Sequence, residues 1–108
     1  KIDNLTAIVD RNGIQLTSWT RDIMNLEPSF ARPRALGWHT IDIDGHNFDQ
    51  ILAALQEARR IKGKPTVIIA RTIKGKGVSF MENNAAFHGK SPTLAEAEKA
   101  LKELEQHC

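Results

Sequence analysis

The chain has 108 residues, which is enough for one modest domain but short for a free-standing α/β enzyme. Hydrophobic residues make up 41% of the sequence and charged residues 26%, as in an ordinary globular protein. The 15 Lys and Arg against 13 Asp and Glu leave a net charge of +2, and this balance excludes a nucleic-acid-binding protein that works through a strongly basic surface.

A strand and a tight turn open the sequence. Residues Leu5–Asp10 are apolar and partly β-branched, which predicts a β-strand. The strand ends in Arg11-Asn12-Gly13, and an Asn-Gly pair is typical of a turn. Residues 14–29 alternate poorly, so we expect an irregular loop with up to one helical turn there, rather than a hairpin partner.

The next segment predicts a short helix and a second strand. In a helix over residues 29–36, Pro33 either lies in the first turn or breaks the helix, and Gly37 supplies the stop. From Trp38 to Asp44 apolar and polar residues alternate, as they do in a strand.

The helical period is clearest after residue 47. Asn47 fits the N-cap position, and Lys62-Gly63-Lys64-Pro65 supplies the stop. Residues Thr66–Thr72 form a nearly continuous apolar run, which is typical of a strand covered on both faces. The apolar positions at helical spacing are Phe48, Ile51, Leu52, Leu55 and Ala58.

A long loop and a final helix complete the predicted elements. The loop has about 20 residues, and loops of this length in compact domains are often functional. Thr93 then caps an amphipathic helix. Cys108 is the single cysteine and has no internal disulfide partner, which favours a reducing, cytoplasmic location, and no apolar run approaches the roughly 20 residues that span a bilayer. The apolar stripe of the helix comprises Leu94, Ala97, Ala100, Leu101 and Leu104.

The order of these elements predicts an α/β fold with a mostly parallel sheet and helices on its faces. Three strands and two good helices would leave exposed sheet edges and an uncovered face. The chain also starts with Lys1 rather than methionine and enters a strand almost at once. We therefore expect a piece of a longer protein, with the remaining strands of the domain upstream.

Three segments leave the carboxyl ends of predicted parallel strands, where open α/β sheets bind ligands. A strand-to-helix turn explains Asp44–Asn47 adequately, so two segments remain as candidates. In the first, the amide oxygen of Asn12 and nearby backbone carbonyls suit Mg²⁺ or Ca²⁺, which prefer oxygen ligands. A plain turn, in which Asn12 and Gly13 supply positive φ, explains the same residues. The spacing alone favours the turn.

The second segment is the long loop. It carries Lys74-Gly75-Lys76-Gly77, in which glycines bring the backbone close to a ligand and lysines act as point charges for phosphates. His88 is suited to acid/base work near neutral pH. The alternative is a basic surface loop with an incidental histidine, which these residues by themselves favour.

These segments match a known pattern. Asn4–Ile14 resembles the second half of the thiamine diphosphate motif, which begins with Gly-Asp-Gly and ends in asparagine. Pro65–Val78, followed by Asn83-Asn84 and Phe87–Lys90, is similar to transketolase, in particular to the type in which the N- and C-terminal halves are separate chains. The likeness covers nearly all 108 residues and favours ligand-binding roles for both segments.

The resemblance implies a cofactor, a cation and roles for four residues. Transketolases hold the diphosphate of thiamine diphosphate through a divalent cation, Mg²⁺ or Ca²⁺. Two of its ligands, the motif asparagine and the backbone carbonyl two residues later, fall on Asn12 and Ile14. Lys74 is expected near the cofactor. His88 is expected to touch the substrate or to assist proton transfer at its hydroxyls.

The implied reaction moves a two-carbon ketol unit from a ketose phosphate to an aldose phosphate, as in the pentose phosphate pathway. The family's site lies between two chains, which implies a dimer of the complete unit and a C-terminal transketolase subunit or domain as partner. No Gly-Asp-Gly occurs in this sequence, although its aspartate is the first cation ligand in the family. We therefore expect residues 1–108 to be the second half of a thiamine diphosphate-binding domain that is inactive alone.

Two other interpretations stay open. Another thiamine diphosphate enzyme, such as a deoxyxylulose-phosphate synthase, has a similar Lys-Gly-Lys-Gly loop with a histidine and would consume pyruvate. A non-catalytic binding or assembly module would instead fold as a stable monomer without cofactor.

Overall fold

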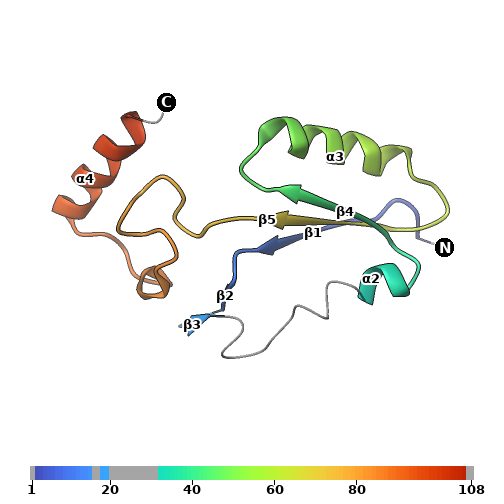
Figure 1. The fold of residues 1–108 in the computed structure, drawn as a ribbon, viewed down its shortest axis with the longest axis horizontal. Helices are drawn as coiled ribbons and strands as arrows, with labels where there is room; N and C mark the ends of the chain where they lie inside the picture. Colours follow the sequence, from blue (N-terminus) through green and yellow to red (C-terminus); the bar gives the residue numbers. More distant parts are fainter. Residues whose placement is uncertain (1, 16–17, 20–31, 107–108) are drawn as a thin grey trace. The chain divides into compact units, whose positions relative to one another are not determined.

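The computed structural model describes residues 2–15, 18–19 and 32–106 (Figure 1). The chain forms two compact units. The first comprises Lys1–Arg11 and Asn25–Thr72, and the second comprises Asn12–Met24 and Ile73–Cys108. None of the helices in the described ranges combines the length and the apolar character of a membrane span.

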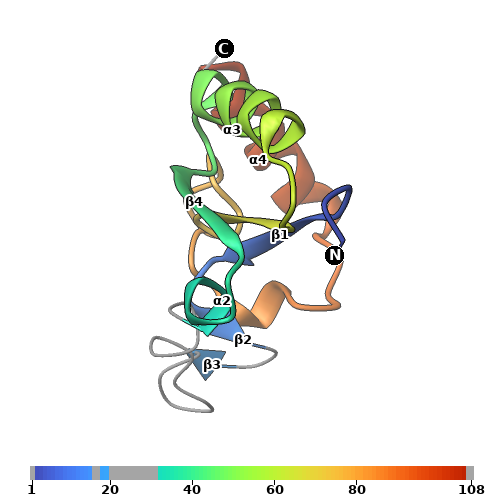
Figure 2. The ribbon, with the colours of Figure 1, turned by 90° about the vertical axis from the view of Figure 1, so that its right-hand side faces the viewer.

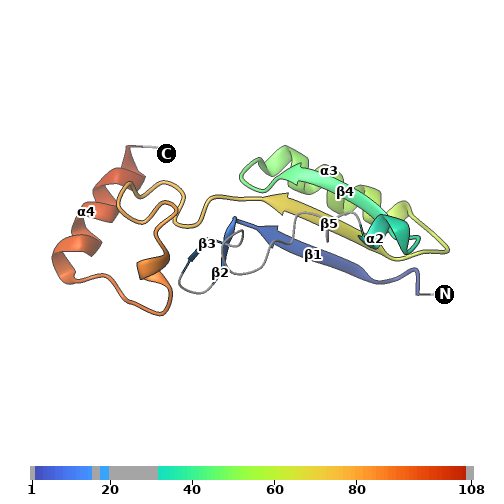
Figure 3. The ribbon, with the colours of Figure 1, turned by 60° about the horizontal axis from the view of Figure 1, so that its bottom comes forward.

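A three-stranded parallel sheet forms the centre of the first unit. The spatial order is β1-β5-β4 (Figure 3), and each outer strand pairs with β5 in parallel over six residues. This confirms the predicted parallel α/β architecture. The strands span, in chain order, β1 Thr6–Arg11, β4 His39–Asp44 and β5 Thr66–Arg71.

Strand β5 lies in the middle because its sequence suits burial on both faces. All side chains from Thr66 to Ala70 are buried, and only 2% of the surface of Ile68 is exposed. A strand of this kind reads as a continuous apolar run instead of alternating. The predicted covering of both faces of this strand is confirmed.

Helix α3 (Phe48–Arg60) connects β4 to β5 and covers one face of the sheet (Figure 2). It begins where predicted, because the Asn47 side chain accepts a hydrogen bond from the backbone N–H of Gln50 at 3.1 Å. Ala54 lies at the centre of a buried apolar cluster with Ile68. The other members of this cluster, some only partly buried, are Ile41, Ile43, Ile51 and Ala70.

The apolar stripe predicted on this helix is only partly buried. Ala54 and Ala58 face the core, but Phe48 is 81% exposed and Leu52 57% exposed. The sheet has three strands, and a single helix packs only a narrow part of its surface against them. Phe48 and Leu52 fall at the predicted helical spacing, but the residues that the structure describes do not bury them.

Helix α2 (Arg32–Ala35) is the described part of the helix predicted over residues 29–36. Pro33 lies in the first turn of this helix and does not break it, which is the first of the two predicted alternatives. Its carbonyl accepts a hydrogen bond from the N–H of Trp38 at 2.9 Å. Gly37 ends the helix with a φ of 82°, a conformation that glycine adopts without strain. The rest of the predicted helix, residues 29–31, lies outside the described residues.

The β1 side of the sheet is open in the described part of the chain. Ile8 lies directly opposite the buried Ile68, yet it is 62% exposed because α3 covers the other two strands. A cavity of about 190 Å³ remains beside it, and Ile51 and Leu55 of α3 line the cavity together with Ile8 and Ile68. The predicted exposed edge is thus confirmed at β1 among the described residues.

The second unit contains a small antiparallel pair, β2 (Ile14–Gln15) and β3 (Ser18–Trp19). This corrects the prediction of an irregular loop from residue 14. Four paired residues are too few to produce a visible alternation in the sequence. Residues 20–29, where up to one helical turn is expected, lie outside the described part of the chain.

Helix α4 (Leu94–Glu105) ends the second unit and starts at the predicted cap. Thr93 and Glu96 form a complete capping box, in which each side chain bonds the other residue's backbone N–H. Its predicted apolar stripe is largely open: Ala100 is buried, whereas Leu94 is 88% exposed and Leu101 60% exposed.

Candidate functional site

The carboxyl ends of the three strands meet at one edge of the sheet. The N–H of Thr72 donates to the carbonyl of Arg11 at 3.2 Å, and the N–H of Gly45 donates to the carbonyl of Arg71 at 2.8 Å. The Thr72 hydroxyl also donates to the carboxylate of Asp10. These contacts join the ends of β1, β5 and β4, so the segments that begin at Asn12 and Ile73 leave the sheet from adjacent strands.

Asn12 forms an Asx turn immediately after β1. Its side-chain oxygen accepts a hydrogen bond from the backbone N–H of Ile14 at 3.0 Å, and Gly13 between them has a φ of 73°. This turn fixes the orientation of the amide and leaves the second lone pair of its oxygen for another partner. The turn and the cation-ligand interpretations are therefore compatible, because an amide oxygen held in this way suits a hard cation.

Lys74 lies at the start of an ordered loop. Its carbonyl accepts a hydrogen bond from the N–H of Asn83 at 2.9 Å, which closes the segment between them into a compact turn. The Lys74 side chain is half-buried, and its ammonium makes no ion pair with any residue that the structure describes. A cation in this state is available to an anionic ligand.

The glycines and Glu82 give this loop its shape. A methyl group on Gly75 would lie 2.6 Å from the carbonyl oxygen of Met81, so no larger residue fits there. The Glu82 carboxylate accepts the N–H of Gly77 at 3.0 Å and lies 3.9 Å from the ammonium of Lys76. The second lysine of the motif thus belongs to the loop's own structure.

Helix α4 holds the next part of the loop. The two oxygens of the Glu103 carboxylate accept the N–H of Ser79 at 2.6 Å and its hydroxyl at 2.8 Å. Val78 beside them is 6% exposed, and Leu104 lies within 3.0 Å of where a Gly77 side chain would begin. These contacts hold the loop that carries Lys74 to α4.

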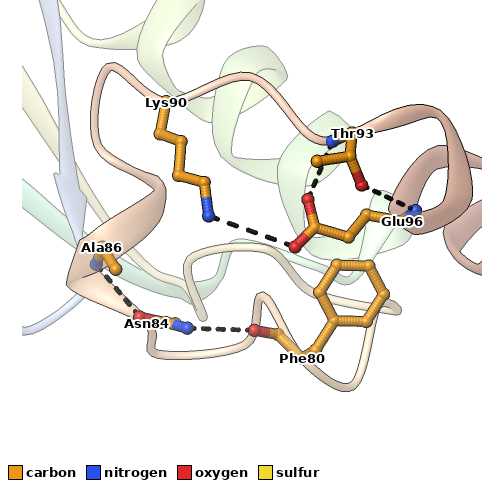
Figure 4. A network of polar contacts seen from close by, with 6 residues as sticks. All are labelled: Phe80, Asn84, Ala86, Lys90, Thr93 and Glu96. Atoms are coloured by element: carbon orange, nitrogen blue, oxygen red, sulfur yellow. Dashed lines mark hydrogen bonds and ion pairs between the residues drawn. The ribbon is translucent and has the colours of Figure 1, made fainter.

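His88 follows a single turn of 3₁₀ helix, η2 (Ala85–Phe87), and its N–H donates to the carbonyl of Ala85 at 3.0 Å. Its side chain is exposed. The turn is capped by Asn84, whose side chain contacts two backbone groups (Figure 4). An exposed imidazole on an ordered backbone is suited to exchange protons with a small molecule.

One carboxyl group near this loop has a shifted pKa. The backbone N–H of Thr93 donates to the Glu96 carboxylate at 2.8 Å and holds the pKa of that carboxyl below its usual value. The Lys90 ammonium, 4.0 Å from the same carboxylate, acts in the same direction (Figure 4). Glu96 therefore remains ionised and keeps the loop attached to the start of α4.

The four predicted site residues fall into two local groups in the second unit. Asn12 and Ile14 share one turn, and Lys74 and His88 share one loop. Glu82, Asn84 and Glu103 hold the loop. The sequence predictions did not include Glu82 and Glu103, and they named Asn84 only as part of the matched motif, without a role. Glu82 had a local signal, since it follows the glycine motif closely, whereas Glu103 is distant in the chain and had none. Among the described residues, no three His, Cys, Asp or Glu side chains gather as a metal site.

Comparison with known proteins places these features in one family. A family profile described as transketolase, thiamine diphosphate binding domain, matches residues 1–106. A 6-deoxy-6-sulfo-D-fructose transketolase subunit from Clostridium sp. strain MSTE9 is 43% identical over 98% of this chain and 38% of its own length. An apulose-4-phosphate transketolase subunit from Phocaeicola vulgatus is 37% identical over the same shares.

The fold agrees with this match. The crystal structure of transketolase from Campylobacter jejuni superposes with a TM-score of 0.68 at 22% identity, over 97% of this chain and 20% of that one. This chain spans 38% of the length of the two subunits named above. A match over residues 1–106 leaves almost none of the sequence outside the domain, and the chain therefore belongs to the transketolase thiamine diphosphate-binding domain family.

Proposed function

We propose that this chain is part of a transketolase that transfers a two-carbon ketol unit from a ketose phosphate to an aldose phosphate with thiamine diphosphate. The observation that carries the proposal is the family match over residues 1–106. It is supported by a packed loop that presents Lys74 and His88, and by the Asx turn at Asn12. The preferred sugars are not part of the proposal, because the two relatives described above differ in the substrate that their names state.

The residues at the end of β1 fit a divalent cation, which we take to be Mg²⁺ or Ca²⁺. The Asn12 amide oxygen and the Ile14 carbonyl oxygen are ligands of the hard type that these ions prefer. The cation would in turn hold the diphosphate of the cofactor. Lys74 would add a positive charge toward the same anion, since its ammonium has no competing ion pair in the described residues.

His88 would handle protons at the sugar. In a ketol transfer the donor loses a hydroxyl proton as its carbon–carbon bond breaks, and the acceptor aldehyde gains one as the new bond forms. Thiamine diphosphate, when bound, supplies the group that accepts the electron pair. A histidine at neutral pH can accept the first proton and return the second, and the exposed imidazole of His88 is free to meet a substrate.

The rest of the machinery would come from other polypeptide. The open edge of β1, the exposed Ile8 and the cavity beside it lack a covering element in the described residues. We propose that residues 1–108 are the second half of the thiamine diphosphate-binding domain, and that the upstream half covers this face and supplies the aspartate of Gly-Asp-Gly. A C-terminal transketolase subunit or domain completes the site, and the complete unit forms a dimer. The 108-residue chain alone would be inactive. A cytoplasmic location remains a prediction from the cysteine content.

Native mass spectrometry of the full-length protein, with thiamine diphosphate and Mg²⁺, is the first test. We expect the cofactor and the cation to remain bound to the assembled protein and to be lost from an Asn12→Ala variant. Failure of the intact assembly to retain the cofactor would refute the proposal and favour a non-catalytic module.

A donor panel then tests the reaction. Suitable donors are 6-deoxy-6-sulfo-D-fructose, apulose 4-phosphate, fructose 6-phosphate and xylulose 5-phosphate, each with an aldose phosphate acceptor. Consumption of at least one donor, with transfer of two carbons to the acceptor, is expected. Consumption of pyruvate instead would favour a synthase of the deoxyxylulose-phosphate type.

A further inference from the structure

The orientation of His88 depends on its neighbours in the chain. Its imidazole is exposed and makes no hydrogen bond in the part of the chain that the structure describes. Among those residues it is anchored through the backbone, where its N–H donates to the carbonyl of Ala85 at 3.0 Å. Within the described residues, the position of this side chain is therefore set by the backbone of η2 and of the residues that follow it.

Asn84 makes the contacts that fix this backbone (Figure 4). Its side-chain oxygen accepts the N–H of Ala86 at 3.0 Å, and its side-chain nitrogen donates to the carbonyl of Phe80 at 3.1 Å. One amide thus joins the turn before η2 to the start of η2. Asn and Gln are the side chains that offer a donor and an acceptor in this arrangement, and a helix of three residues depends strongly on its cap.

Ring contacts hold the residues on both sides of His88. The Phe87 ring packs against the Phe80 ring, with centroids 5.8 Å apart and planes inclined at 56°. The Lys90 ammonium lies 4.9 Å from the centroid of Phe87 and 4.0 Å from the Glu96 carboxylate. His88 and Gly89 therefore lie between two residues, Phe87 and Lys90, that side-chain contacts hold in place. Phe80 takes part both in the ring contact with Phe87 and in the hydrogen bond with Asn84.

We propose that Asn84 is a positioning residue for His88. It joins the Phe80 turn to η2 and so sets the direction in which the imidazole meets the substrate, without touching substrate or cofactor itself. This proposal rests on the proposed function, since it requires His88 to act on the sugar. It adds a residue whose loss should impair proton transfer while cofactor binding remains.

A double-mutant cycle in the full-length holoenzyme tests this dependence. The variants are His88→Ala, Asn84→Ala and the combination. Each is measured as kcat/KM with a donor that the wild-type enzyme consumes in the panel above, and as the Kd of thiamine diphosphate. Loss of an acid/base group costs about 10²–10⁴-fold, and a misplaced one about 10- to 100-fold. If Asn84 acts through His88, the double variant should be as impaired as His88→Ala alone, within about twofold.

Two further variants separate positioning from damage to the loop. Asn84→Asp keeps the acceptor for Ala86 but loses the donor to Phe80, so its kcat/KM should fall between wild type and Asn84→Ala. It also provides a folded variant if Asn84→Ala is unstable. Asn83→Gly is the matched control: Asn83 is exposed, has a φ of 54° that glycine accepts, and should keep wild-type activity.

The outcomes are distinct. Non-additive losses with an unchanged cofactor Kd support the proposal. Additive losses, an active Asn84→Ala enzyme, or a cofactor Kd that weakens as much as kcat/KM would each overturn the positioning role while the role of His88 stands. A fully active His88→Ala enzyme would overturn the assignment of His88 itself, and with it the role of Asn84.

Discussion

Gly45 directly follows β4, and its N–H donates to the carbonyl of Arg71 at the end of β5. A single methyl group on Gly45 should therefore disturb this end of the sheet. A Cβ atom at this position would lie 2.4 Å from the Thr72 Cγ2 methyl, and 3.1 Å from both the Ala70 Cβ and the Arg71 carbonyl oxygen. Its φ is not among the positive values of the chain, so the cost of Gly45→Ala is steric alone. Overpacking of this kind costs about 1–3 kcal/mol in the free energy of unfolding.

A compensating substitution makes this prediction specific. Thr72→Ser removes the methyl group in the closest contact but keeps the hydroxyl that donates to Asp10, and alone it should cost about 0.8 kcal/mol or less. In the Thr72→Ser background, Gly45→Ala should then cost at least about 0.5 kcal/mol less than in wild type. The recovery should be partial, because the two 3.1 Å contacts remain.

Urea-induced unfolding of the full-length protein measures all four members of the cycle. Gly63→Ala is the control, because no atom lies within 4 Å of its added methyl and its cost comes from a φ of 79°. That cost should be the same with Thr72 or Ser. A stable Gly45→Ala protein, or an equal loss in both backgrounds, would refute the reasoning.

Three other predictions concern charge and ligands. Lys74→Met should weaken thiamine diphosphate binding about tenfold or more, measured by isothermal titration, because the diphosphate loses a positively charged partner. Lys64 lies before the opposite end of β5, so a Lys64→Met control should bind the cofactor normally. Removal of Mg²⁺ with a chelator should release the cofactor from the wild-type holoenzyme, and Asn12→Ala should raise the Mg²⁺ concentration needed to restore it; a chelator-resistant cofactor would contradict the cation role. The Glu96 pKa is lowered in the folded state, so its stabilising effect is present above the unfolded pKa near 4.5 and is lost as the pH falls through the folded pKa. The melting temperature of wild type should therefore fall more steeply than that of Glu96→Gln on acidification from about pH 6, and parallel curves would contradict this linkage.

The elements with strong local signals could be predicted from the sequence. Asn47 and Thr93 each cap a helix through a hydrogen bond to a residue three positions later, so both starts are local events. The continuous apolar run of β5 indicated burial on both faces, and this followed from composition alone. The short pair β2 and β3 could not be predicted, because two-residue strands carry no periodicity.

The roles of Lys74 and His88 stay predictions, because they came from the family resemblance and not from the residue types alone. The contacts that hold their loop could not be predicted from the sequence. The support of the loop by Glu103 depends on a contact across 24 residues, which no local pattern encodes. Likewise, the outward direction of Phe48 follows from how many strands one helix can cover, a property of the assembled sheet and not of the helix.

The central position of β5 has a consequence for synthesis. In the described part of the chain, β1 and β4 pair only through β5, and Thr6 of β1 meets Thr66, which is added 60 residues later. At about 5–20 residues per second, the ribosome takes about 3–12 s to cover this interval. Throughout that time the apolar strand β1 is without its β5 partner, and no ladder among these three strands can form. Until β5 has been made, the backbone edges of β1 and β4 lack their ladder partner, and such unpaired edges are prone to aggregation.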